Sequence, residues 1–239
     1  MKTTPIYLED SYQKEMDASI LDVYPESDGR WRVVLDQTVF YPMGGGQATD
    51  QGTLTSDTLH AEVYQVMMKD GEIQHFIKSD TEPLVGDKIH GVINWDRRYT
   101  NMKKHSAGHI VDFAMYQLGY SPKSLVPLKG DHDKKLSILY GGDIGKDIKQ
   151  ELEDKANELV AKDLSFSWSF EPFEKIQTEA IYLQPGLPTN KPLRMLRLEG
   201  VGSVADGGTQ VHKTSEVGKI TIPSIQVQDG NTLVLYSLT

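Results

Sequence analysis

Hydrophobic and polar residues alternate along the first part of the chain, a pattern typical of strands that bury one face. Aspartate–glycine pairs at residues 28–29 and 70–71 favour tight turns between such segments. A succession of short antiparallel strands is typical of a small barrel. We therefore predict an N-terminal β-barrel with strands at residues 19–24, 30–35, 59–67 and 88–95.

The period of the hydrophobic residues changes at residues 95–96. From there the spacing predicts a helix over residues 97–118, with Asp96 as its cap and Gly119 at its end. Because strands and helices do not alternate regularly after this point, we predict an α+β fold with a mixed or antiparallel sheet, in domains at residues 1–95 and 96–239. The other elements expected in the second domain are helices at residues 143–164 and after Pro172, and strands at residues 135–140, 165–170, 193–199, 219–225 and 232–236.

The composition narrows the chemistry that the chain can carry. It contains no cysteine, so a metal ion would be bound by nitrogen and oxygen atoms alone. The net charge of -9 argues against a general nucleic-acid-binding surface. No segment reaches the roughly 20 apolar residues of a membrane span. The N-terminal residues also lack the apolar run of a signal peptide, so we expect a cytoplasmic protein that does not associate with a membrane.

Two histidines, His105 and His109, lie four residues apart in the first predicted helix. Residues at that spacing share a helix face, so both imidazoles can face one metal ion. Zinc proteases of the H-E-x-x-H type use the same spacing, but here Ser106 stands where their general base would be. The pair alone is also consistent with two buried histidines that bond to neighbouring groups.

A glycine turn in the segment 206–211 (Asp-Gly-Gly-Thr-Gln-Val) offers further donor atoms. Asp206 can coordinate a metal through a carboxylate oxygen, and Gln210 can coordinate weakly or bond a substrate. His212 would share a face with Gln210 if the segment is extended. Alone, Asp-Gly-Gly is equally typical of an ordinary β-turn.

A third candidate is the glycine-rich segment 40–52, which contains Gly44, Gly45 and Gly46. Three consecutive glycines are typical of a close approach to a ligand or of a flexible loop between strands. No Lys-Ser or Lys-Thr pair follows them, so the segment is not a nucleotide-binding P-loop.

In this order and spacing, the three segments resemble the freestanding alanyl-tRNA editing proteins of the AlaX family, in their medium-length form, and the editing domain of alanyl-tRNA synthetase. Residues 40–52 (FYPMGGGQATDQG) resemble the family's glycine-rich motif, and residues 95–111 (WDRRYTNMKKHSAGHIV) its His-x-x-x-His motif. Residues 206–218 (DGGTQVHKTSEVG) resemble its second metal motif. The resemblance covers roughly residues 39–220.

The resemblance implies a hydrolase that removes serine or glycine from mischarged tRNA(Ala) and so maintains translation fidelity. Such an activity is needed because a pocket for a small side chain cannot strongly reject near-isosteres by binding alone. The resemblance also implies a Zn²⁺ cofactor and a glycine-rich loop that reaches from the barrel to the editing site.

Residue roles follow from the motifs. We expect His105, His109 and Asp206 to bind the metal. Clustered basic residues before the histidines are candidates for phosphate contacts, although such a run is often a solvated helix face. The full set comprises catalytic contacts from Gln47, Thr209 and Gln210, substrate contacts from Thr38, Gly44, Gly45 and Gly46, and tRNA phosphate contacts from Arg97, Arg98, Lys103 and Lys104.

The chain departs from the family's pattern in the second metal motif, which normally supplies a cysteine and a histidine where this chain has Asp206 and Gln210. Three arrangements are open. Zinc can be held by His105, His109, Asp206 and water, which we favour. Alternatively, His212 replaces the missing histidine after a register change, or the site has lost its metal and binds substrate directly. The last arrangement suits a non-catalytic tRNA-binding protein, and a zinc hydrolase of some other ester or amide is a further alternative.

Overall fold

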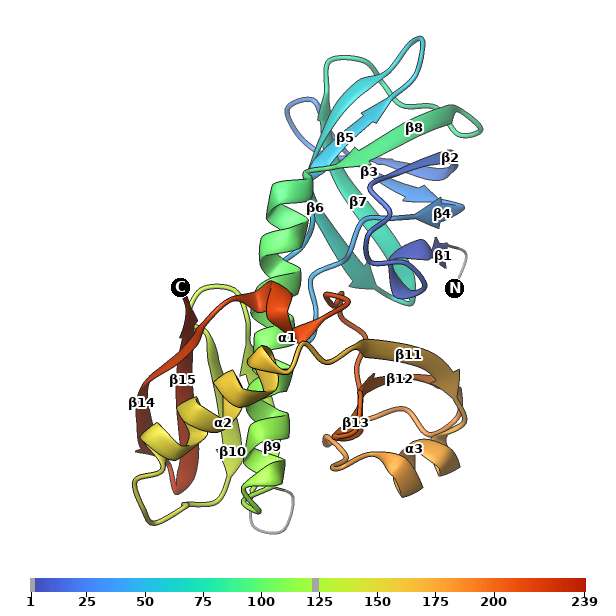
Figure 1. Cartoon of the computed structure of the whole chain (residues 1–239). Helices are drawn as coiled ribbons and strands as arrows, with labels where there is room; N and C mark the ends of the chain where they lie inside the picture. Colours follow the sequence, from blue (N-terminus) through green and yellow to red (C-terminus); the bar gives the residue numbers. More distant parts are fainter. Residues whose placement is uncertain (1–2, 122–124) are drawn as a thin grey trace. The chain divides into compact units, whose positions relative to one another are not determined.

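The computed structural model describes residues 3–121 and 125–239 and contains two compact units, Met1–Asn101 and Met102–Thr239. The division falls inside helix α1 (Trp95–Gln117), which begins at the boundary expected from the change of period. Figure 1 shows the strands of the first unit in blue through cyan to green and the elements of the second in lighter green through yellow to red.

The first unit is a closed antiparallel barrel, which confirms the predicted barrel and the α+β class. Its strand order is β2-β3-β7-β6-β5-β8. Strand β7 escaped the sequence pattern because three consecutive residues, Ile73, Gln74 and His75, are all buried. The elements of this unit are β1 (Thr4–Pro5), η1 (Ile6–Leu8), β2 (Glu15–Pro25), β3 (Arg30–Leu35), β4 (Gln37–Thr38), β5 (Gly52–Thr55), β6 (His60–Lys69), β7 (Glu72–Ser79) and β8 (Lys88–Ile93).

The glycine-rich segment forms a tight hairpin whose tip is exposed. The backbone amides of Gly44 and Gln47 each donate to the other residue's carbonyl oxygen, at 3.3 and 2.8 Å. The two residues between them, Gly45 and Gly46, have φ angles of 54° and 79°. A hairpin turn with two positive φ values strongly favours glycine at both central positions, so the turn alone accounts for two of the three glycines.

A buried ion pair ties the start of helix α1 to the segment that follows this hairpin. The Arg98 guanidinium is fully buried and donates from Nε to both carboxylate oxygens of Asp50, at 3.1 and 2.9 Å. Its Nη1 donates to the Ser11 carbonyl oxygen at 2.9 Å, and its Nη2 donates to Asp50 and to the Val39 carbonyl oxygen. The prediction that Arg98 contacts a phosphate is therefore corrected, because this side chain stabilises the interior of the first unit.

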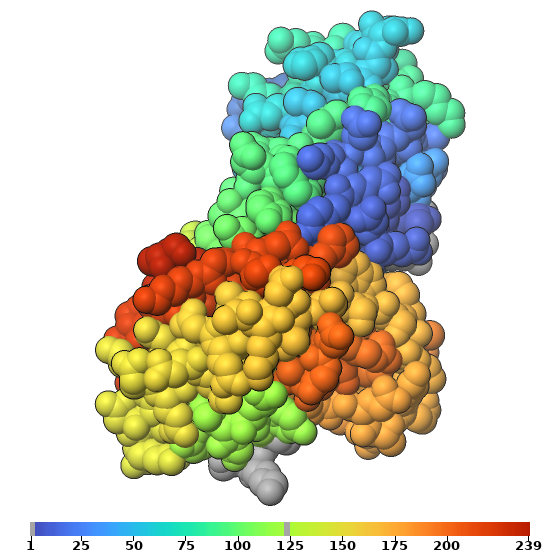
Figure 2. Space-filling model, viewed as in Figure 1, coloured from blue at the N-terminus to red at the C-terminus, as the bar shows by residue number. Residues whose placement is uncertain are grey.

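Among its described residues, the second unit contains two antiparallel sheets. One has the order β14-β15-β10-β9 and the other the order β11-β12-β13. Helix α2 packs on η2, where the Thr214 hydroxyl donates to the Leu159 carbonyl oxygen at 2.9 Å; Figure 2 shows this helix in yellow beside the orange-red segment that leads into strand β14. The elements are β9 (Val126–Asp131), β10 (Ser137–Gly141), α2 (Lys149–Ala161), β11 (Phe166–Glu171), α3 (Phe173–Glu179), β12 (Leu193–Leu198), β13 (Gly202–Ala205), η2 (Thr214–Val217), β14 (Ile220–Gln228) and β15 (Asn231–Leu238).

Helices α1 and α2 both begin at residues other than those predicted from the sequence. Helix α1 begins two residues earlier because the Asn94 side chain, not Asp96, accepts a hydrogen bond from the Arg97 backbone amide, at 3.1 Å. Helix α2 begins at Lys149 instead of residue 143, since Gly145 adopts a φ of 68° that a helix does not allow. Among the described residues, no helix is long and apolar enough to cross a membrane.

The Arg98–Asp50 pair gives a direct test of this packing. Replacing Arg98 with alanine leaves the Asp50 carboxylate buried without its cation, and we expect the free energy of unfolding to fall by about 3–5 kcal/mol. The matched control is the exposed Arg30 on β3, whose replacement by alanine should change stability by less than about 0.5 kcal/mol. Urea unfolding measures both, and equal midpoints for the two variants would contradict the assignment.

Candidate metal centre

Helix α1 places His105 and His109 on one buried face. The two imidazoles stack at 5.0 Å between ring centroids and 21° between ring planes, as expected for residues one helical turn apart. Both side chains are almost completely excluded from solvent. The sequence prediction that the two rings share a face is therefore confirmed.

The loop after β13 brings Asp206 to both rings. Its Oδ1 atom lies 3.4 Å from Nε2 of His105 and 3.4 Å from Nε2 of His109. Within the described residues, these three side chains form a group whose ligand atoms all lie within 4.8 Å of one another. Ligands about 2.0–2.1 Å from a tetrahedral zinc ion are separated by about 3.3–3.4 Å, so both nitrogen–oxygen distances suit two donors around one ion.

The carboxylate of Asp112 lies on the other side of the His109 ring. His109 Nδ1 lies 3.6 Å from Asp112 Oδ2. The hydroxyls of Tyr140 and Tyr182 donate to the two oxygens of Asp112, at 2.6 and 2.8 Å, and so fix this carboxylate. A carboxylate behind a histidine is the usual support of a metal-binding imidazole, because it orients the ring and sets its tautomer.

The buried charges shift the pKa values of these groups. Burial lowers the pKa of His105 well below its usual value, despite the neighbouring Asp206. Burial alone would also lower the pKa of His109, but Asp112 and Asp206 outweigh it and raise that pKa to about 9. Burial alone would raise the pKa of Asp206, yet His105, His109 and Arg194 hold it well below its usual range. A neutral His105 and an ionised Asp206 are the forms that bind metals, and an ion would replace the proton on His109.

The second oxygen of Asp206 is bound to the protein. Arg194 on β12 is buried, and its Nη1 donates to Asp206 Oδ2 at 3.2 Å and to the Gly208 carbonyl oxygen at 2.8 Å. The Gly208 amide donates to Asp206 Oδ1 at 3.0 Å, in a short turn of the kind predicted for Asp-Gly-Gly. The described donors therefore suit a zinc ion held by two nitrogens and one oxygen, with a position left for a further ligand.

The other predicted residues of the second motif take different places. Gln210 is fully buried, with its side-chain amide bonded to Ser106 and Asp206. Thr209 is also fully buried. His212 is exposed, and its ring stacks on Trp168 at 6.0 Å, so it does not belong to the cluster of His105, His109 and Asp206. The predicted alternative in which His212 replaces the missing ligand is not the arrangement in this structure.

Sequence reasoning missed a third histidine, His132 at the end of β9. Its ring is buried and stacks on His105 at 4.5 Å, and burial lowers its pKa to about 4. Its Nδ1 lies 2.5 Å from the Tyr236 hydroxyl, which in turn donates to the Lys104 carbonyl oxygen at 3.0 Å. The ring fits because Gly108 has no side chain: a Cβ there would lie 2.5 Å from Cε1 of His132.

Residues predicted in the first unit divide between buried and accessible positions. Thr38 is fully buried. Its hydroxyl forms a hydrogen bond with Nε2 of His75 at 2.8 Å and accepts one from the Phe40 amide at 3.0 Å. We therefore withdraw Thr38 from the predicted substrate contacts. Gln47 is also buried, whereas Gly44 and Gly45 are exposed at the hairpin tip.

The remaining basic residues of α1 are partly exposed. Arg97 Nε donates to the Thr49 carbonyl oxygen at 2.9 Å. Lys104 Nζ donates to the Asp133 carbonyl oxygen at 3.3 Å. Lys103 is half-buried. These three residues keep the accessibility that a phosphate contact requires, which Arg98 does not have.

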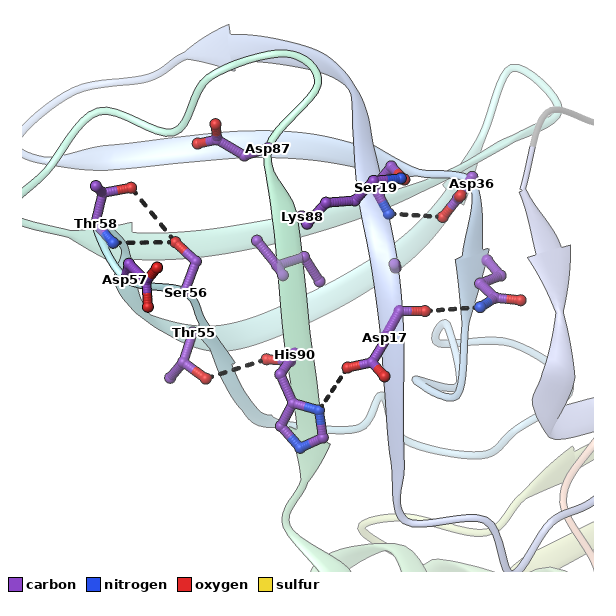
Figure 3. Close-up of a pocket in the computed structure, with 13 residues that line it drawn as sticks. Asp17, Ser19, Asp36, Thr55, Ser56, Asp57, Thr58, Asp87, Lys88 and His90 are labelled. Atoms are coloured by element: carbon purple, nitrogen blue, oxygen red, sulfur yellow. Dashed lines mark hydrogen bonds and ion pairs between the residues drawn. The ribbon is translucent and has the colours of Figure 1, made fainter.

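A separate pocket of about 770 Å³ lies on the barrel (Figure 3), and none of the predicted site residues lines it. Its polar groups bond largely to one another. His90 Nδ1 lies 2.9 Å from Asp17 Oδ1, and Lys88 Nζ donates to the Ser19 hydroxyl at 2.6 Å. Asp36 accepts from the Ser19 amide at 2.8 Å. These bonds account structurally for the polar residues named here, and we assign no ligand to this pocket.

The chain is similar in sequence to proteins that act on tRNA, as their names state. The family of class II (A) tRNA synthetases matches residues 11–97. The alanine–tRNA ligase of Halobacterium salinarum is 34% identical over 96% of this chain, and the alignment covers 25% of the ligase. The chain thus spans about a quarter of the length of these ligases.

Freestanding relatives are similar over a larger share of their own length. The alanyl-tRNA editing protein AlaX-M of Saccharolobus solfataricus is 33% identical, with 99% of each chain aligned. The protein AlaX-L of Pyrococcus horikoshii is 33% identical over 91% of this chain and 53% of its own. The chain is therefore a relative of alanine–tRNA ligases over about a quarter of their length. The chain belongs to the AlaX family of alanyl-tRNA editing proteins.

Exchanging Gly108 for alanine tests the packing of the third histidine. Alanine is favoured over glycine within a helix by about 1 kcal/mol. We nevertheless expect a net destabilisation of about 1–3 kcal/mol, because the new methyl group displaces the His132 ring. Gly207→Ala is the control, since a Cβ at Gly207 meets nothing within 4 Å. If Gly108→Ala unfolds at the same or a higher temperature than the control, the close contact is not present.

Proposed function

We propose that the protein is an aminoacyl-tRNA hydrolase that edits mischarged tRNA(Ala) by removing serine or glycine from its 3′ end. The observation that carries this proposal is the convergence of His105, His109 and Asp206 in one buried cluster. These residues occupy positions that resemble both metal motifs of the family. The names of the AlaX-M and AlaX-L relatives as alanyl-tRNA editing proteins support the same activity.

The cluster suits a Zn²⁺ cofactor held by His105, His109 and Asp206. When bound, zinc supplies Lewis-acid polarisation of a carbonyl oxygen or activation of water. Asp112 keeps the His109 ring in position, and Arg194 fixes the oxygen of Asp206 that does not face the histidines. The carboxylate takes the place of a thiolate, so we expect weaker retention of zinc than in a site with cysteine.

Water is the proposed nucleophile. The chain has no cysteine, and the serine between the two histidines, Ser106, is occupied within the fold. Its hydroxyl donates to Gln210 at 2.6 Å and accepts from the Val211 amide at 3.0 Å. A serine nucleophile would need an adjacent base in its place, so direct hydrolysis of the ester suits these residues better than a covalent intermediate.

The remaining roles are proposals about substrate contacts. The exposed glycines of the barrel hairpin suit a close approach to the aminoacyl end, with Gln47 beside them in sequence. Thr209 is proposed to act near the amino acid. Arg97, Lys103 and Lys104 are the proposed contacts to tRNA phosphates. The proposed location of the protein is the cytoplasm, where tRNA is charged.

Deacylation assays test the proposed function directly. We expect metal-loaded protein to hydrolyse Ser-tRNA(Ala) or Gly-tRNA(Ala), and chelation to reduce the rate. His105→Ala should lower the rate on the order of 100-fold, because it removes a ligand of the ion. The control is His60→Ala, an exposed histidine on β6, which should retain full activity. If the metal-loaded protein binds tRNA without turnover on either substrate, it is a non-catalytic tRNA-binding protein and the hydrolase proposal is wrong.

The role of Asp112 can be tested through metal binding. Asp112→Asn weakens the acceptor for His109 Nδ1, and we expect the dissociation constant for Zn²⁺ to rise 10–100-fold. Asp96→Asn, an exposed position in the same helix, is the control and should bind zinc as the unaltered chain does. Competition with a coloured chelator measures both. Equal affinities would show that Asp112 does not support His109.

A further inference from the structure

We propose that Gln210 is a positioning residue that does not ligate the metal. A buried series of hydrogen bonds through Ser106, Gln210, Asp206 and Arg194 holds the loop after β13 (residues 206–211, here called the glycine loop) on helix α1. The ion is therefore bound by three side chains, His105, His109 and Asp206, and can leave without releasing the glycine loop. The inference rests on the proposed function in one respect, since the ion is that of the proposed editing site. It concerns how that ion is held and what holds the site together without it.

The series of hydrogen bonds begins on helix α1, at a serine between the two metal-binding histidines. The Ser106 hydroxyl is fully buried and lies 2.6 Å from Oε1 of Gln210. The Val211 backbone amide donates to the same hydroxyl oxygen at 3.0 Å. One serine side chain therefore bonds to two consecutive residues of the loop, which are separated from it by more than 100 residues of sequence.

The directions of these bonds settle the orientation of the Gln210 amide. Its Nε2 lies 2.9 Å from Oδ2 of Asp206, and the same oxygen accepts a hydrogen bond from the Arg194 guanidinium at 3.2 Å. Reversing the amide would set its oxygen against this carboxylate, which is repulsive. Oε1 must therefore face Ser106, whose hydroxyl has its proton to donate because its oxygen accepts from Val211. The one atom of Gln210 that suits a metal ion is engaged by a serine.

Asp206 divides its two oxygens between the framework and the ion. Oδ2 accepts hydrogen bonds from Gln210 and from Arg194 Nη1, at 2.9 and 3.2 Å. Oδ1 accepts from the Gly208 amide at 3.0 Å and also faces the two histidines at 3.4 Å. A buried carboxylate bonded to a buried guanidinium has its charge compensated by the protein itself. The loop is thus fixed whether or not an ion is present.

This arrangement explains how the site is held although Asp206 and Gln210 stand where the family's second metal motif has a cysteine and a histidine. In the family's pattern, the second motif supplies two metal ligands, so the ion itself connects the loop to the helix. Here Gln210 and the Val211 amide make that connection through hydrogen bonds to Ser106, while Arg194 on β12 fixes Asp206. Among the described residues, only Asp206 remains as a candidate ligand from the loop. Metal ions bound by fewer protein ligands are held less tightly and contribute less to folding.

A double-mutant cycle on the intact protein tests the series of hydrogen bonds from Ser106 to Asp206. Ser106→Ala and Gln210→Met should each raise the Zn²⁺ dissociation constant about 10-fold or more, because each frees Asp206 to move. The double variant should lose no more affinity than either single variant, since both changes break the same chain. If Gln210 is a ligand, Ser106→Ala leaves the affinity unchanged or improves it, and the proposal is overturned. Ser121→Ala, at a buried serine of the same unit with no hydrogen-bond partner for its hydroxyl among the described residues, is the control and should have no effect.

A second measurement needs no variant and so does not depend on how the variants fold. Hydrogen exchange of the Val211 amide is followed in the unaltered chain, with zinc and after removal of metal with EDTA. The proposal predicts that Val211 remains protected in the metal-free protein, because Ser106 still accepts its hydrogen bond. Loss of protection on metal removal would show that the ion holds the loop and would overturn the proposal.

Both readouts are independent of deacylation. If mischarged tRNA is not hydrolysed while the cycle and the Val211 protection behave as described, the proposed function fails and this inference stands. If hydrolysis occurs but Ser106→Ala has no effect on metal affinity, the proposed function stands and this inference fails.

Discussion

The carboxylate of Asp206 is the contact on which the whole site depends. It joins a helix and a loop that are about a hundred residues apart in sequence, and it does so where water is excluded. A charge in such a place requires compensation, and Asp206 receives it on one oxygen from Arg194 and on the other from His109, whose pKa is raised. Removing Arg194 would take away the guanidinium that compensates this buried charge.

The two units solve a similar problem in similar ways. In each, a glycine-containing segment adjoins a buried aspartate, Asp50 in the first unit and Asp206 in the second, and a buried arginine binds that aspartate. Glycine gives each segment its turn, but a flexible backbone loses entropy when it is ordered. The buried ion pairs fix these segments, so each glycine-containing segment is held in one conformation. A single helix, α1, supplies Arg98 to one unit and the two histidines to the other.

Local periodicity predicted most of the fold, and helix geometry predicted that His105 and His109 share a face. Helical spacing would also have indicated Asp112, which follows His109 by one turn. The run of basic residues before the histidines was misleading for Arg98, because charge alone does not reveal whether a side chain is solvated or paired in the interior. That difference depends on Asp50, and the sequence carries no local sign of the pairing.

Contacts between distant segments escaped prediction for the same reason. Arg194 and His132 lie in unremarkable strand sequences, and their roles appear only when β12 and β9 are placed beside the loop and the helix. The prediction that Asp206 lies beside the two histidines came from the resemblance to a family, not from the spacing of residues. The substitution of Gln210 looked like a lost ligand in the sequence, whereas the structure shows an amide with definite hydrogen-bond partners on both sides.

The central claim is that two imidazoles of helix α1 and one oxygen of Asp206 share a single ion. X-ray absorption at the zinc edge of the metal-loaded protein measures the ligands most directly. The account predicts one zinc ion per chain, with two imidazole nitrogens and oxygen donors at about 2.0–2.2 Å. A spectrum with no imidazole, with a single imidazole, or with a third imidazole from another histidine would contradict it.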